Sequence, residues 1–221
     1  MRRLLRENGL TIVLVSAFLI FWGGQSVAGY REYQQEQKQH EQSGGNYWSY
    51  LGSSHFWEAT TENWESEFLQ IFFYVFLTAF LYQKGSAESR KLDGENPVDR
   101  DPRAHRLRRD APWPVKRGGL ALNLYEHSLS IAFFLFLLGA ITLHAVSGAR
   151  VYSQEQVDHG EAPMSVLKYV GTSRFWFESF QNWQSEFLAI ALVVVFSIFL
   201  RQRGSPESKP VDSPHSETGS G

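Results

Sequence analysis

The chain has 221 residues, no cysteine, seven tryptophans and a formal net charge of −2 at pH 7. The absence of cysteine excludes disulfides, thiolate metal sites and cysteine nucleophiles. The near-neutral charge argues against a nucleic-acid partner, which would require a basic face. The mildly negative mean hydropathy is typical of a soluble protein, but the apolar residues are concentrated in four blocks that long polar stretches separate.

Four uncharged apolar blocks dominate the chain. They cover residues 10–28, 68–82, 128–146 and 187–200. The first and third are long enough to cross a bilayer, which takes about 20 residues, whereas the other two need extension. A soluble helical bundle is the alternative, but too little other chain remains to bury four helices that are apolar on every side. We therefore expect an all-α integral membrane protein, with four transmembrane helices at about 8–29, 63–83, 126–148 and 182–202.

The N-terminal block also has features of a secretory signal peptide, because three arginines precede it and "SVAG" follows. A membrane span is favoured because a related segment recurs in the middle of the chain. At an offset of 119 residues the two halves align without a gap. Between 54–89 and 173–208, 18 of 36 positions are identical. The sequence therefore predicts a tandem duplication of a two-span unit, in parallel orientation because each unit has an even number of spans.

This duplication sets the expected domain organisation. The predicted segments are repeat unit 1 (1–89), a cytoplasmic linker (90–119), repeat unit 2 (120–208) and a disordered tail (209–221). Of the 21 lysines and arginines, 16 fall before the first apolar block, in residues 83–119 or after the last apolar block. The positive-inside rule then places both termini and the linker in the cytoplasm and the two aromatic loops outside.

The predicted outer loops are rich in tryptophan and tyrosine. Amphipathic aromatic side chains favour the headgroup region, so we expect short interfacial helices near 47–62 and 166–181. The candidate interfacial anchors are Trp48, Trp57, Trp64, Trp176 and Trp183. A sugar-binding or peptide-binding aromatic surface is the alternative.

The motif "NWxSEFL" opens both even-numbered spans and places small polar side chains on one helical face. Equivalent positions in the odd-numbered spans hold a glutamine and a histidine at a similar depth. The predicted polar cluster at the outer rim comprises Asn63, Ser66, Glu67, Asn182, Ser185, Glu186, Gln25 and His144. Such a cluster is typical of an ion or proton site. Interhelical hydrogen bonding is the favoured interpretation, because these acids lie at the rim and not at the midplane.

The segments "NWQSEFL" (182–188), "RGSPES" (203–208) and the loop 150–160 resemble an uncharacterised family of bacterial multi-pass membrane proteins whose domain has no assigned function. The resemblance covers nearly the whole chain and implies a bacterial integral membrane protein, for which we expect the inner membrane as location. It implies no activity.

Neither a nucleophile–base arrangement nor a metal-ligand motif is found, so we expect a non-enzymatic protein without cofactor or metal. A structural or envelope-associated role is favoured, with the lipid bilayer and a second copy or another membrane protein as partners. The alternative is a small proton or cation channel or transporter that uses the polar cluster.

Overall fold

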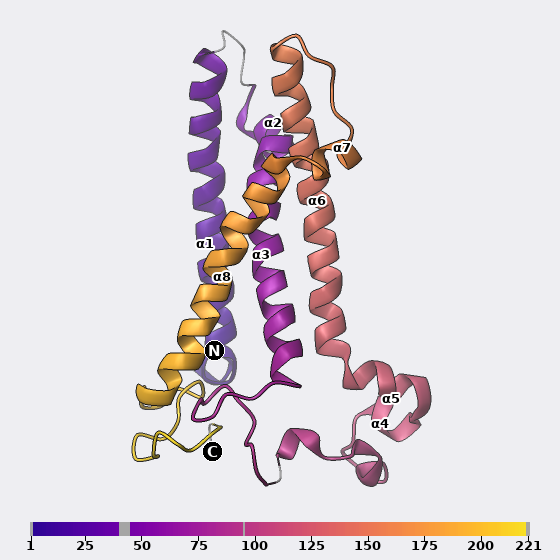
Figure 1. The fold of residues 1–221 in the computed structure, drawn as a ribbon, viewed down its shortest axis with the longest axis vertical. Helices are drawn as coiled ribbons and strands as arrows, with labels where there is room; N and C mark the ends of the chain where they lie inside the picture. Colours follow the sequence, from indigo (N-terminus) through magenta and orange to yellow (C-terminus); the bar gives the residue numbers. More distant parts are fainter. Residues whose placement is uncertain (1, 40–44, 95, 220–221) are drawn as a thin grey trace. The chain divides into compact units, whose positions relative to one another are not determined.

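The computed structural model describes residues 2–39, 45–94 and 96–219 (Figure 1). Every regular element in these residues is helical. Residues 40–44 of the first predicted outer loop and the end of the predicted tail, 220–221, lie outside the described residues. The chain forms two compact units: Met1–Thr60 with Leu143–Tyr169, and Thr61–Thr142 with Val170–Gly221.

The first unit is built around α1 (Arg2–Gln39), α2 (Tyr47–Leu51) and α7 (Val166–Val170). It also contains the start of α3 (Ser54–Thr78) and the end of α6 (Ser128–Asp158). α1 bends at Asn8, which has non-helical backbone angles. Asn46 is the N-cap residue of α2, and its side-chain oxygen accepts a hydrogen bond from Ser49 N at 2.9 Å.

The second unit contains the remaining parts of α3 and α6, together with α8. α8 (Ser173–Phe199) begins where Thr172 Oγ1 accepts a hydrogen bond from Phe175 N. The segment between α3 and α6 carries four short helices: η1 (Pro97–Asp99), η2 (Pro102–His105), α4 (Trp113–Arg117) and α5 (Gly119–Glu126). The predicted linker thus contains regular structure.

Among the described residues, three helices are long and apolar enough to cross a membrane: Arg6–Lys38, Ser128–Asp158 and Ser173–Phe199. α3 is not among them, although it has 25 residues. Its N-terminal half carries several glutamates, which lower its apolar content. The helix also ends at Thr78 and not near 83, because residues 79–81 close as turns onto Phe76 and Leu77.

The predicted interfacial segments 47–62 and 166–181 are mostly parts of longer helices. Only α2 and α7, with five residues each, are separate short helices. Two residues separate α2 from α3, and two separate α7 from α8. Residues 209–219 of the predicted tail form turns held by hydrogen bonds, where the composition predicts disorder.

Helix boundaries recur at the 119-residue offset. α1 and α6 end at Gln39 and Asp158, α2 and α7 share both bounds, and α3 and α8 begin at Ser54 and Ser173. The bend at Asn8 corresponds to His127, where α5 ends and α6 follows.

Candidate functional site

Polar side chains join α3 to α8 within the second unit. Asn182 Nδ2 donates to Glu62 Oε1 at 2.5 Å, and Trp183 Nε1 donates to Glu65 Oε1 at 3.1 Å. One helical turn further along, Gln70 Nε2 donates to the main-chain oxygen of Glu186 at 2.9 Å. Hydrogen bonds to charged or carbonyl acceptors of this kind hold apolar helices in register.

The residues of the polar face that the sequence predicts on α3 differ in burial. Ser66 is buried, whereas Asn63 and Glu67 are exposed. Ser66 Oγ donates to the main-chain oxygen of Asn63 within its own helix, and Ser185 does the same with Asn182. The buried acid is Glu65, whose exposed fraction is 0%.

Sequence reasoning missed Glu65 because it falls outside the pattern shared by the two halves. The equivalent position holds Gln184, which is exposed. That difference was itself a signal: Glu65 is the one acidic side chain of "NWESE" that "NWQSE" lacks.

The remaining predicted members belong to the first unit. His144 is fully buried, and Gln25 is exposed beside the buried Ser26. Ser26 Oγ, and not Gln25, makes the hydrogen bonds here, to Gly23 O at 2.7 Å and Tyr47 Oη at 2.6 Å. The expected meeting of Gln25 and His144 with the glutamates stays a prediction.

The predicted tryptophan anchors differ in exposure. Trp48 is 77% exposed and Trp176 is 40% exposed, as suits side chains that contact headgroups. Trp57, Trp64 and Trp183 are partly buried. The indole of Trp183 is committed to Glu65, so this side chain contributes to helix packing.

Phenylalanine rings follow the polar contacts along the helices of the second unit. Phe68 and Phe72 stack near Phe136 and Phe134 of α6, with ring centroids 5.3 and 5.4 Å apart. Phe73 lies 6.0 Å from Phe187 of α8. All three pairs are tilted, and Phe134 and Phe136 are 43% and 57% exposed, so the rings form an apolar layer that reaches the helix surface.

At two places in the first unit, a tyrosine side chain packs directly against a helical glycine. A Cβ added to Gly148 would lie 2.5 Å from Tyr169 Oη, and one added to Gly29 would meet Tyr50 Oη. Both tyrosines are buried. Gly29 and Gly148 therefore allow α2 and α7 to approach the long helices closely.

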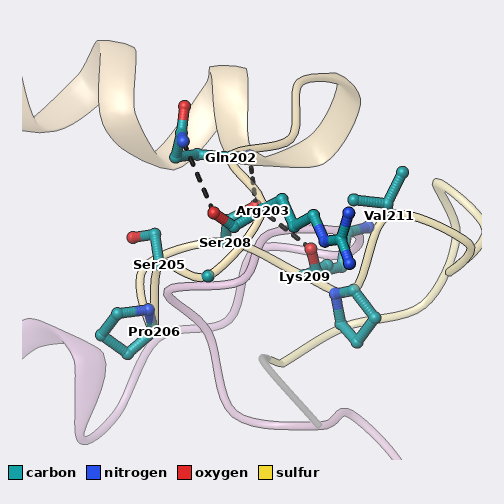
Figure 2. A pocket seen from close by; sticks show the side chains of 9 residues that line it. Gln202, Arg203, Ser205, Pro206, Ser208, Lys209 and Val211 are labelled. Atoms are coloured by element: carbon teal, nitrogen blue, oxygen red, sulfur yellow. Dashed lines mark hydrogen bonds between the residues drawn. The ribbon is translucent and has the colours of Figure 1, made fainter.

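Two serine-rich loops, 83–89 and 202–208, have matching hydrogen bonds. Ser89 Oγ accepts from Gln83 N, and Ser208 Oγ accepts from Gln202 N, each at 2.9 Å (Figure 2). Gly85 and Gly204 have the same positive φ of 87°, which glycine adopts without strain. The first loop also docks on α8, where Ser197 Oγ lies 2.8 Å from Ser86 Oγ and accepts from Ala87 N at 3.2 Å.

The second loop surrounds an open hollow of about 530 Å³, shown in Figure 2. Lys209 lies beside it, but its Nζ donates to the main-chain oxygens of Pro214, His215 and Glu217. Burial lowers the pKa of Lys209 from its ordinary value, and Arg201 adds to the decrease. Because Lys209 is engaged in this way, the hollow has no second cation to support Arg203 in holding an anion.

The helices and their exposed apolar side chains define the class: an all-helical protein with membrane-type helices. The chain belongs to the family described as a domain of unknown function (DUF6766), whose model matches residues 1–220. Comparisons with curated proteins and with solved structures give no match.

Proposed function

We propose that this chain is a non-enzymatic, multi-pass protein of the bacterial inner membrane with a structural or envelope-associated role. The observation that carries the proposal is the apolar surface of α1. Leu10, Ile20 and Phe21 are 75%, 69% and 75% exposed. In water such a continuous apolar stripe is unfavourable, whereas lipid covers it at no cost.

The proposal includes four spanning helices, α1, α3, α6 and α8, arranged as a duplicated two-helix unit. The matching helix boundaries, the two glycine–tyrosine contacts and the two serine-rich loops support the duplication. The linker and both termini would lie in the cytoplasm, and residues 29–66 and 148–186 would lie outside. The aromatic outer segments would then contact lipid headgroups, a second copy or another membrane protein.

Topology can be tested sharply because the chain has no cysteine. We would introduce single cysteines by Gly160→Cys, Asp93→Cys and Asp212→Cys and label intact cells with a membrane-impermeant maleimide. Labelling of position 160 in intact cells, and of positions 93 and 212 only after lysis, supports the proposal. Labelling of position 93 or 212 in intact cells contradicts it.

A second candidate is a proton or cation conductor, favoured by the fully buried carboxyl group of Glu65. A buried acid in a membrane helix is costly and is retained where it has a role. Against conduction stands the phenylalanine layer that follows the polar contacts, since it offers no polar path.

Ion flux into proteoliposomes separates the two candidates. We would compare the wild-type chain with Glu65→Gln and with the double variant Glu67→Gln/Glu186→Gln, from about pH 5 to about pH 8. If the folded Glu65→Gln variant loses an ion flux that the wild-type chain shows, the protein is a conductor and the structural role is wrong. Equal flux in wild-type and empty liposomes would leave Glu65 as a helix-packing residue.

A further inference from the structure

A mostly apolar cavity of about 270 Å³ lies between α3, α8 and the loop 83–89 of the second unit. Its apolar walls come from Leu77, Leu81, Phe187, Ile190 and Val194. The cavity has the size for a benzyl group or a short alkyl chain, since one water occupies about 30 Å³ of liquid.

A carboxyl group lies at the polar end of this cavity. Glu88 lines the cavity and accepts a hydrogen bond from Tyr74 Oη through Oε2. Its Oε1 is buried and has no donor among the described residues. Glu207, at the equivalent position of the second serine-rich loop, raises the pKa of the Glu88 carboxyl group through its negative charge.

Three cations of the second unit, Arg90, Arg201 and Lys209, have partners other than these carboxyl groups. Arg90 pairs with Asp99 at 2.6 Å and donates to Ala79 O at 2.5 Å. Arg201 donates to main-chain oxygens, including that of Ser213. Lys209 likewise donates only to main-chain oxygens among its described contacts. No described cation forms an ion pair with Glu88 or Glu207, so the carboxyl pair keeps an unmatched negative charge when it is ionised.

Aromatic rings complete the cavity. Tyr74 and Tyr82 both line it, and the guanidinium of Arg90 already lies 4.8 Å from the ring centroid of Tyr82. An apolar cavity with tyrosine rings and a carboxylate is the chemistry that recognises organic ammonium ions.

We propose that this cavity binds a small amphipathic ammonium ion, with its apolar group between α3 and α8 and its charged head at Glu88. The site is separate from the polar contacts near Glu65, and it goes beyond the structural role proposed above. Nothing in the binding step requires ion transport.

The charge state of Glu88 makes binding depend on pH. Burial raises the pKa of the Glu88 carboxyl group above its ordinary value. Glu207 raises this pKa further, and the hydrogen bond from Tyr74 opposes the rise. Protonation removes the charge that attracts the cation, so affinity is higher at alkaline pH than at acidic pH.

The test is equilibrium dialysis of radiolabelled benzyltrimethylammonium against the full chain in an uncharged detergent. Neopentylbenzene, the neutral analogue of the same shape, is the ligand control. We expect Glu88→Gln to weaken binding about tenfold or more, because it removes the negative charge that attracts the ammonium ion. Asp212→Asn removes one exposed negative charge away from the cavity and should leave affinity unchanged.

A second variant keeps the test independent of the carboxylate. Val194→Phe fills the apolar end of the cavity and should also weaken binding, even where Glu88→Gln fails to fold. Competition by short-chain phosphatidylethanolamine but not phosphatidylglycerol would identify a lipid amine as the source, and no competition by either would identify a free amine. Absence of binding to the wild-type chain, equal binding of the neutral analogue, or unchanged binding in folded Glu88→Gln would overturn the proposal.

Discussion

The contact between Gly148 and Tyr169 gives the most direct test of how the first unit packs. A Cβ at Gly148 would lie 2.5, 2.7 and 2.8 Å from Oη, Cε1 and Cζ of Tyr169, all well inside van der Waals contact. Tyr169 is 0% exposed, so its ring has no room to move aside. Overpacking of this kind costs about 1–3 kcal/mol, of which alanine regains about 0.5–1 kcal/mol through its better helix propensity.

Gly139, on the same helix, provides the matched control because a Cβ there meets nothing within 4 Å. We expect Gly139→Ala to raise the free energy of unfolding by about 0.5–1 kcal/mol. Gly148→Ala should lower it by up to about 2.5 kcal/mol, the overpacking cost less the propensity gain. The difference between the two variants isolates the clash with Tyr169.

The equivalent contact at Gly29 differs in one testable respect. Only the Tyr50 hydroxyl oxygen is severely close there, since Cζ and Cε1 would lie at 3.3 and 3.9 Å from the added Cβ. Tyr50→Phe should therefore rescue Gly29→Ala, whereas Tyr169→Phe should leave most of the Gly148→Ala defect, because ring carbons still clash.

Unfolding in mixed dodecyl maltoside and dodecyl sulfate micelles, followed by far-ultraviolet circular dichroism, measures these differences. Equal stability of Gly148→Ala and Gly139→Ala would refute the packing argument. Rescue of Gly148→Ala by Tyr169→Phe would show that the hydroxyl group alone carries the contact.

Three further predictions use the same unfolding assay on the second unit. Trp183→Phe removes the hydrogen bond to Glu65 and should cost about 1–3 kcal/mol; an unchanged value would exclude a packing role for that bond. Ser197→Ala leaves the buried Ala87 N–H without its acceptor and should cost about 1–3 kcal/mol. A loss below about 0.5 kcal/mol, which is typical of ordinary surface substitutions, would contradict this role of Ser197. The raised pKa of Glu88 means that the folded state holds its proton more tightly than the unfolded state, whose ordinary value is 4.5. Stability should therefore fall as pH rises from 4.5 through the raised value, and Glu88→Gln should flatten that dependence; an equally steep profile in the variant would assign it to another group.

The apolar blocks predict the helical class and the long helices because lipid-facing composition is a property of each segment alone. Helix ends are harder to predict. The turns after Thr78 depend on the docking of loop 83–89 against Ser197, which lies more than 100 positions along the chain. A local pattern carries no record of such a partner.

The polar site shows the same division. The shared motif drew attention to Glu67 and Glu186, yet burial selects Glu65, two positions away on α3. A step of two residues turns the side chain to nearly the opposite face of a helix, so a motif identifies the segment but not which of its acids is buried. The cavity beside Glu88 depends on tertiary packing and has no motif of its own.

The first serine-rich loop is completed by a distant part of the chain. Gly85 N donates to Thr218 Oγ1 at 2.9 Å across a separation of 133 residues, and Gly219 N donates to Ser86 O at 2.9 Å. During synthesis this loop emerges from the ribosome long before its partners exist. Its polar groups must rely on water until translation passes Thr218, so this loop is completed only after Thr218 and Gly219 have been synthesised.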